Sequence, residues 1–137
     1  MLDKAFEALK TYDWGVDPKV LGPINEAINA SHGDADARKQ LETRLAAVLS
    51  SDVSQAAKDA VCRALRTIGT AASVPALAGL LKDEKLSHMA RYALQVNSAP
   101  EASQALLAAL PNAPAKIKIG IASSLGARGG DLPAAPF

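Results

Sequence analysis

The chain has 137 residues, a formal net charge of +1 and a hydrophobic content of 49%. This length allows one domain with a sizeable core, and the near-neutral charge gives no sign of a nucleic-acid or anionic-membrane partner. No uninterrupted apolar stretch approaches the roughly 18 residues that cross a bilayer, and the single cysteine excludes an internal disulfide. These features favour a cytoplasmic protein with no membrane partner.

Apolar residues recur at helical spacing along the chain, whereas no segment alternates with the period of two that is typical of strands. The expected helices span residues 2–12, 18–30, 34–49, 53–68, 72–82, 84–96, 100–110 and 114–125. We expect Gly22 and Pro23 to distort the first turn of the second helix, because proline lacks an amide donor. Gly33, Gly69 and Gly126 are expected to end the helices before them, Gly33 in the left-handed conformation.

Capping residues and prolines mark the expected helix starts. Asp17 precedes Pro18, Asp34 begins the third helix, and residues 50–52 are expected to close that helix and cap the next. A pattern of capping residue, any residue and proline then occurs at 73–75, 98–100, 112–114 and 131–133. The pattern predicts N-caps at Ser73, Ser98, Asn112 and Asp131.

Residues 71–97 and 99–127 are two copies of one sequence repeat. Each has an apolar helix that begins near a proline, a short polar break and a second apolar helix, and Leu77 and Leu81 align with Leu106 and Leu110. Such a period indicates a helical repeat, in which neighbouring units stabilise one another. We therefore expect a single domain with units at 1–33, 34–69, 70–97 and 98–128, and the truncated start of a further unit at 129–137.

The stretch AASVPALAGLLKDEKLSHMARYALQVN at 71–97 resembles the short HEAT-like repeat of the phycobilisome-lyase type. The shared pattern is a Pro-initiated helix ending in Leu-Leu, an acidic turn, and a second helix with Arg and Ala before a closing Leu. The likeness is good over 71–97, fair over 34–69 and 99–127 and weak over 1–33, and the last copy has Lys118 or Gly120 in place of Arg91. It implies a right-handed all-α solenoid of about four helix pairs, with the second helices on the concave side.

The best candidate for a binding surface is a set of polar side chains on the second helices: His88, Arg91, Tyr92, Gln95, Lys58 and Arg66. The first four are spaced i, i+3, i+4 and i+7, so they share a helical face opposite the apolar stripe. Arginine and tyrosine are common anchors in protein interfaces. The alternative is that Arg91 is structural and bonds loop carbonyls or an acidic residue of a neighbouring unit.

HEAT-like repeats occur in bilin lyases, adaptors, scaffolds and a family of DNA glycosylases, so the resemblance indicates no single function. The expected function is a non-enzymatic interaction or scaffold module that holds a protein partner on its concave face. One alternative is a ligand-handling or bilin-lyase-like enzyme subunit, in which His88, Arg91 and Tyr92 grip a carboxylate or phosphate. The other is nucleic-acid binding through a weak basic stripe that Arg91 forms with Lys58, Arg63, Arg66, Lys116 and Lys118, with Asp59 placed to neutralise Arg63.

No catalytic residue, metal site or cofactor is expected. Cys62, His32 and His88 lie in different units and match no metal-ligand spacing, and Cys62 is expected to be a small buried thiol. Trp14 is expected to anchor the N-terminal end. At the other end we expect the apolar side chains Leu106, Leu110, Ile117 and Ile121 to be partly uncovered, which would favour self-association there.

Overall fold

The computed structural model describes residues 2–128, except for the side chains of Pro18 and Asn112. Over this range the chain is helical and contains no strand, so the predicted all-α class is confirmed. The helices are α1 (Leu2–Leu9), α2 (Gly22–Ala30), α3 (Ala35–Leu49), α4 (Gln55–Ile68), α5 (Val74–Ala78), α6 (Ser87–Val96), α7 (Pro100–Ala109) and α8 (Ala115–Arg128). Three 3₁₀ turns accompany them: η1 (Pro18–Leu21), η2 (Ala71–Ser73) and η3 (Leu110–Asn112).

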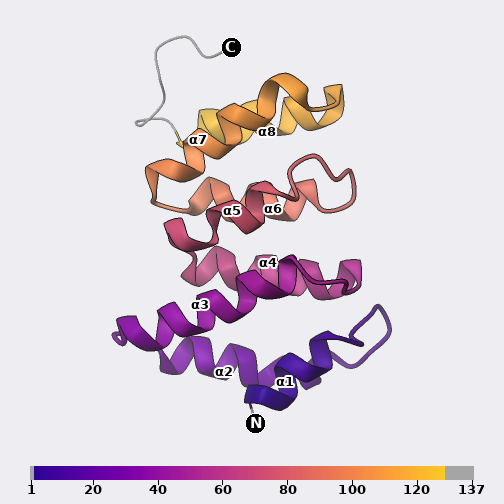
Figure 1. Ribbon diagram of the computed structural model, residues 1–137, viewed down its shortest axis with the longest axis vertical. Helices are drawn as coiled ribbons and strands as arrows, with labels where there is room; N and C mark the ends of the chain where they lie inside the picture. The colour runs from indigo at the N-terminus through magenta and orange to yellow at the C-terminus, as the bar shows by residue number, and fades with distance from the viewer. Residues whose placement is uncertain (1, 129–137) are drawn as a thin grey trace.

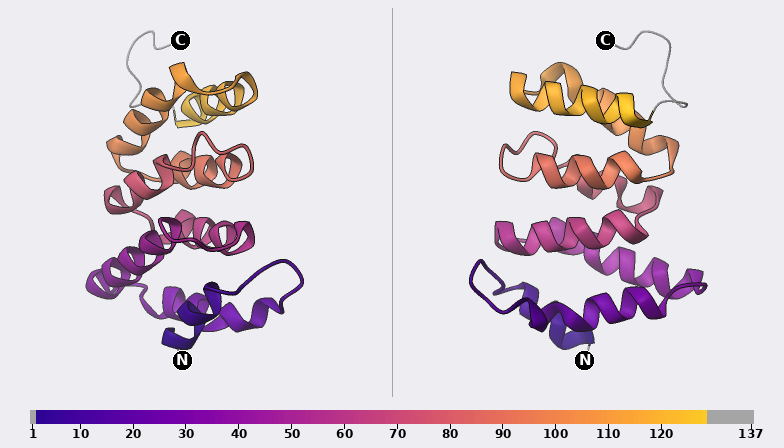
Figure 2. Two further views of the ribbon diagram at one scale, coloured as in Figure 1. Left: turned by 45° about the vertical axis from the view of Figure 1, so that its right-hand side comes forward. Right: turned by 180° about the vertical axis from the view of Figure 1, so that it is seen from behind.

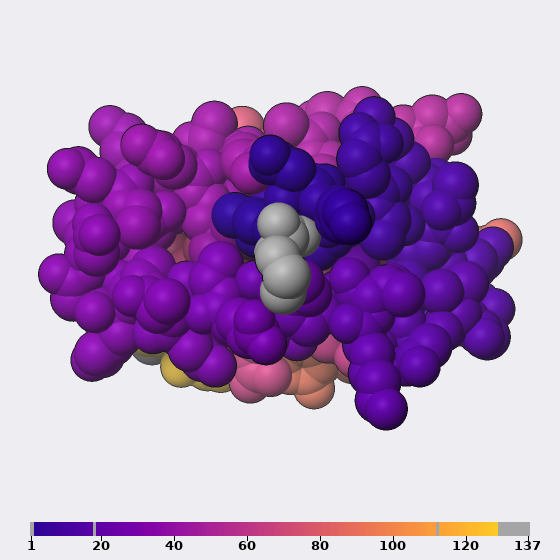
Figure 3. All heavy atoms as spheres, turned by 90° about the horizontal axis from the view of Figure 1, so that it is seen from below, coloured from indigo at the N-terminus to yellow at the C-terminus, as the bar shows by residue number. Residues whose placement is uncertain are grey.

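The helices pack as successive pairs, α1 with α2, α3 with α4, α5 with α6 and α7 with α8. The pairs follow one another along the long axis of the molecule in chain order (Figure 1). The second helices α4, α6 and α8 pack in series, as do α3, α5 and α7, so first and second helices form two layers (Figure 2). Seen from below, α1, α2 and α3 cover most of the N-terminal end (Figure 3).

A single apolar core runs between the two layers from Ala5 in α1 to Leu125 in α8. Leucine supplies most of its large side chains, and Leu45, Leu77 and Leu106 are fully buried. The burial expected for Leu77 and Leu81 is therefore confirmed, although α5 ends at Ala78 and Leu81 enters the core from the turn that follows. The predicted helix over 72–82 was too long because the chain tightens after α5 into i→i+3 hydrogen bonds, such as Leu81 N to Ala78 O at 3.1 Å.

Several predicted helix ends are confirmed. The Asp34 carboxylate accepts a hydrogen bond from Ala37 N at 3.1 Å, and Asp17 accepts one from Lys19 N at 3.0 Å. Gly33 has a φ of 83°. The turn before Gly22 and Pro23 is 3₁₀ rather than α.

Other predicted caps were wrong. Ser54, and not residues 50–52, caps α4 through its hydroxyl and Ala57 N, which are 3.1 Å apart. Ser73 occupies the N-cap position of α5, but its side chain makes no capping hydrogen bond; Thr70, which accepts from Ala72 N, caps η2 instead. Ala99, and not Ser98, is the N-cap residue of α7, and Asn97 accepts from Ala99 N just before that helix. Ser54 lies two to four positions downstream of the predicted cap, whereas Thr70 lies three positions upstream of Ser73, because the chain makes the extra turn η2 before α5. The Asn112 side chain and Asp131 lie outside the part of the chain that is described.

Buried polar side chains join the turns between successive pairs. The Glu42 carboxylate, 2% exposed, accepts hydrogen bonds from the Thr70 amide and hydroxyl and from Ser73 N. Asn97 donates to Thr70 O at 3.1 Å. Arg128 donates to the carbonyls of Leu94 and Ala99 at 2.8 and 3.0 Å. These bonds satisfy backbone groups that helix ends leave without intrahelical partners.

The C-terminal end differs from the sequence prediction in two ways. Helix α8 continues through Gly126 to Arg128, where the carbonyl contacts just described hold its last turn. The side chains expected to be partly uncovered are largely enclosed, since Leu106 and Ile121 are fully buried and Ile117 is 8% exposed; only Leu110 is half-buried. They belong to or pack against the common core, whereas the large apolar side chain that α8 exposes is Ile119. Residues 129–137, assigned to a further unit, lie outside the described range.

At the opposite end, the expected anchoring role of Trp14 was wrong. Its side chain is 63% exposed, in the segment between α1 and η1, and Val16 and Val20 nearby are each 39% exposed. The indole is therefore not part of the core, which α1 enters through Ala5 and Leu9 instead.

Candidate binding surface

Part of the predicted polar patch forms the junction between α6 and α8. Arg91 Nη1 donates to Gly120 O and to Ser124 Oγ, both at 3.2 Å, and Ser124 Oγ donates to Gln95 Oε1 at 2.9 Å. The structural alternative for Arg91 is thus partly correct, because it bonds a carbonyl of the following pair. The guanidinium is nevertheless only half-buried, and His88 is exposed, as the patch prediction required.

Gly120 leaves room for this junction. A Cβ atom at that position would lie 2.7 Å from Arg91 Nε, so with any other residue the guanidinium would have to shift. The sequence had marked Gly120 as a departure from the repeat pattern. The structure shows that this departure and Arg91 fit together.

The exposed part of the patch is a cluster centred on Tyr92. The His88 ring meets the Tyr92 ring edge-on with centroids 4.6 Å apart, and the guanidinium carbons of Arg66 and Arg91 each lie 5.5 Å from the Tyr92 ring centre. His88 Nδ1 is 3.0 Å from Arg91 Nη2. Because arginine can only donate, Nδ1 accepts this hydrogen bond and the His88 ring carries its proton on Nε2. We call His88, Arg91, Tyr92 and Arg66 the tyrosine cluster.

The structure therefore brings together five of the six predicted residues, namely the tyrosine cluster and Gln95. Lys58 is half-buried on α4, two turns before Arg66, and within residues 2–128 its side chain makes no hydrogen bond or ion pair. Arg63 is paired with Asp59 at 3.0 Å, as the sequence suggested. This pair and the contacts of Arg91 leave fewer free cations for the proposed basic stripe.

Cys62 is fully buried in α4. Burial, with a smaller contribution from the Asp59 carboxylate, raises the pKa of the Cys62 thiol from 9.0 to about 12. The side chain is therefore a neutral thiol at physiological pH and has none of the thiolate character of a reactive cysteine. The prediction of a small buried thiol is confirmed.

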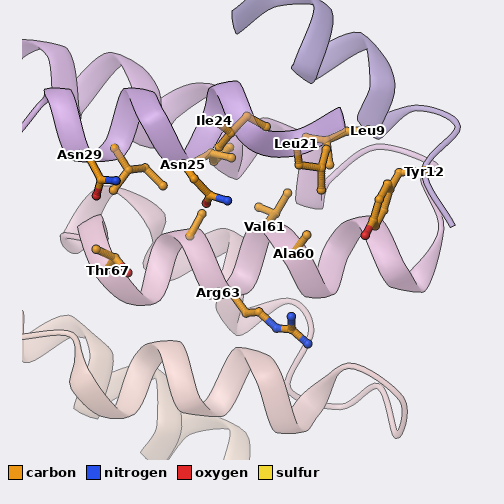
Figure 4. Close-up of a pocket in the computed structure, with 13 residues that line it drawn as sticks. Leu9, Tyr12, Leu21, Ile24, Asn25, Asn29, Ala60, Val61, Arg63 and Thr67 are labelled. Carbon is orange, nitrogen blue, oxygen red and sulfur yellow. The ribbon is translucent and has the colours of Figure 1, made fainter. Parts of the chain in front are cut away.

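The structure also contains a pocket that the sequence analysis did not identify, between the first pair and the second. Helix α2 lies less closely against α4 than α4 does against α6, which leaves a slot of about 420 Å³ (Figure 4). Its floor is apolar and includes Leu21, Ile24 and Val61, and its walls carry polar groups. We call it the α2–α4 slot.

The polar groups of the slot come from both of its walls. Asn25 and Asn29 lie on α2, Thr67 and Arg63 lie on α4, and Tyr12 stands at one end (Figure 4). Among the described residues, the side chains of Asn25, Asn29 and Thr67 have no hydrogen-bond partner. The i, i+4 spacing of the two asparagines indicates that they share one face of a helix. Nothing in the sequence indicates that α2 lies at a distance from α4.

Within residues 2–128, no group of three or more His, Cys, Asp or Glu side chains is placed to hold a metal ion, and none of the helices is both long and apolar enough to cross a membrane. Comparison of the chain with family models, curated proteins and solved structures finds no match. The assignment of function therefore depends on the α2–α4 slot and the tyrosine cluster.

Proposed function

We propose that this protein is a non-enzymatic binding module of the right-handed, HEAT-like α-solenoid type, which holds a protein partner on the concave face formed by its second helices. The observation that carries the proposal is the continuity of that face. Helices α2, α4, α6 and α8 lie in series (Figure 2), with the α2–α4 slot followed by the tyrosine cluster between α4 and α6.

The chemistry of the tyrosine cluster supports a protein ligand. Aromatic and arginine side chains give large contact areas with a fixed geometry, and they dominate the energetics of protein interfaces. The exposed Val96 on α6, at 47%, adds apolar area. By contrast, Arg91 already uses Nη1 on α8 and Nη2 on His88, which counts against the grip on a carboxylate or phosphate that a ligand-handling enzyme subunit would need.

The proposal can be tested with a displayed library of random linear peptides selected against the immobilised full chain. Selected peptides are then measured by calorimetry against wild type, Tyr92→Ala and Glu101→Ala. We expect Tyr92→Ala to weaken part of the selected set about tenfold, in the range found for interface anchors. Glu101 is exposed on α7 in the other layer, so Glu101→Ala should leave all affinities unchanged. Failure to enrich any peptide, or equal losses in both variants, would contradict the proposal.

A further inference from the structure

The α2–α4 slot has the dimensions of an extended chain segment. Its wall on this side runs from Leu21, at the end of η1, to Asn29 in α2, a distance of about 12 Å at the rise of a helix. This corresponds to three or four residues of extended peptide at about 3.3 Å each. The volume of about 420 Å³ lies within the usual range for sites that enclose a small ligand.

Apart from Arg63, the polar groups of the slot are neutral and can both donate and accept hydrogen bonds. Asn25, Asn29 and Thr67 are exposed and offer amide and hydroxyl groups that have no partner among residues 2–128. The charged lining residue is Arg63, whose guanidinium is paired with Asp59 at 3.0 Å and points away from the slot (Figure 4). A ligand rich in neutral amides therefore matches the slot better than an anion does.

The spacing of the asparagines matches a peptide backbone. Residues four apart in a helix are separated by about 6 Å along its axis, and an extended peptide presents equivalent amide groups on one edge every 6.6 Å or so. Asn25 and Asn29 can thus each pair with one peptide unit of the same strand. Side chains of a strand alternate in direction, so a residue between those units can project onto the apolar floor formed by Ile24 and Val61.

We propose that the α2–α4 slot binds an extended peptide segment, with one aliphatic side chain on its floor and the peptide backbone hydrogen-bonded by Asn25 and Asn29. This inference rests on the proposed binding function and names the chemistry of one of its sites. A fatty acyl chain would fill the same floor but would make no hydrogen bond with Asn25 or Asn29. Peptide is therefore the ligand that matches both the apolar floor and the two asparagines.

The test uses the ¹⁵N-labelled full chain and the capped pentapeptide Ac-Ala-Ala-Leu-Ala-Ala-NH2, with binding followed through backbone amide shifts. Three further probes separate the parts of the proposal. The same peptide with N-methylated amides on both sides of leucine lacks the backbone donors, the all-alanine peptide lacks the aliphatic group, and octanoate supplies an acyl chain without peptide groups.

We expect the leucine peptide to shift the amides of α2 and α4, and both altered peptides to bind at least about fivefold more weakly. The double variant Asn25→Ala/Asn29→Ala should lose about five- to tenfold in affinity for the leucine peptide. Gln104→Ala, which removes an exposed amide from α7, is the matched control and should bind normally. Ala60→Trp, which fills the slot, should abolish the shifts while keeping wild-type helix content.

Shifts that fall outside α2 and α4, or equal binding of the N-methylated peptide, would overturn the inference. So would tight binding of octanoate that is insensitive to the asparagine substitutions, which would mark an acyl-chain site. The library-selected peptides distinguish failure of the slot assignment from failure of the proposed binding function. If they bind Ala60→Trp with full affinity but lose affinity in Tyr92→Ala, the binding function stands and the slot assignment is wrong.

Discussion

Position 69 requires glycine because a side chain has no room there, and not because of its backbone conformation. Its φ of −63° and ψ of 142° are open to any residue, yet a Cβ atom there would lie 2.5 Å from Leu65 O and 3.0 Å from Ser73 Oγ. The nearer obstacle is backbone, which cannot rotate away. A glycine is therefore required where α4 turns into η2.

We predict that Gly69→Ala lowers the free energy of unfolding by about 1–3 kcal/mol, the usual cost of overpacking. Gly126→Ala is the matched control, because Gly126 is helical and a Cβ atom there meets nothing within 4 Å. Alanine should stabilise that site by about 0.5–1 kcal/mol. Urea unfolding of both variants measures the difference, and a neutral or stabilising Gly69→Ala would show that the close approach to Leu65 O is absent.

Cys62 gives a second prediction, on pH. Its folded-state pKa of about 12 lies above the ordinary 9.0, so the unfolded chain releases the thiol proton first as the pH rises. The contribution of Cys62 to stability is complete below about pH 9 and is lost between pH 9 and 12. Wild type should therefore lose more stability than Cys62→Ala across this window, whereas the two should show the same pH dependence below pH 8. A steeper loss in Cys62→Ala would contradict the burial of the thiol.

At the scale of the elements, Glu42 couples α3 to the start of the next pair. Its buried carboxylate accepts three hydrogen bonds, two from Thr70 and one from Ser73. Glu42→Ala leaves these donors without their partner and should cost about 2–4 kcal/mol. Glu26→Ala, which removes an exposed carboxylate from α2, should stay within about 0.5 kcal/mol of wild type. Thermal and urea unfolding of the two variants test this prediction. A near-neutral Glu42→Ala would show that this junction contributes little to the free energy of unfolding.

Arg91 performs the same kind of role between α6 and α8, and the prediction for it follows from its two contacts on α8. Arg91→Ala should lower the free energy of unfolding by about 1–2 kcal/mol through the lost bonds to Gly120 O and Ser124 Oγ. Arg66→Ala removes only an exposed cation near Tyr92 and should cost less than about 0.5 kcal/mol. Equal stability losses in the two variants would show that the contacts of Arg91 on α8 do not contribute to stability.

The helices themselves could be predicted well because apolar spacing and glycine or proline breaks are local signals. Their ends were harder to predict. Ser73 and Ala99 begin α5 and α7 without a side-chain cap, whereas Thr70 and Asn97, just upstream, are held by hydrogen bonds to other pairs. The face of α6 that carries Arg91 was predicted from its spacing, but the partner of Arg91 was not, because only the position of α8 determines that Arg91 meets Gly120. The α2–α4 slot could not be predicted from the sequence, because it depends on the distance between two helices.

At the scale of the whole molecule, the second helices provide one face on which the slot and the tyrosine cluster follow each other (Figure 2). A partner that extends along this face would contact both sites. The first-helix layer, with α3, α5 and α7, would remain free. Binding should therefore protect one layer of the molecule and leave the other unchanged.

Amide hydrogen exchange of the full chain, with and without a saturating library-selected peptide, tests this account most directly. We predict slower exchange in α2 and α4, extending to α6 for peptides that are sensitive to Tyr92→Ala, and unchanged exchange in α3 and α7. Protection confined to α3, α5 and α7, or none in either layer at full occupancy, would contradict the claim that the second helices form the binding face.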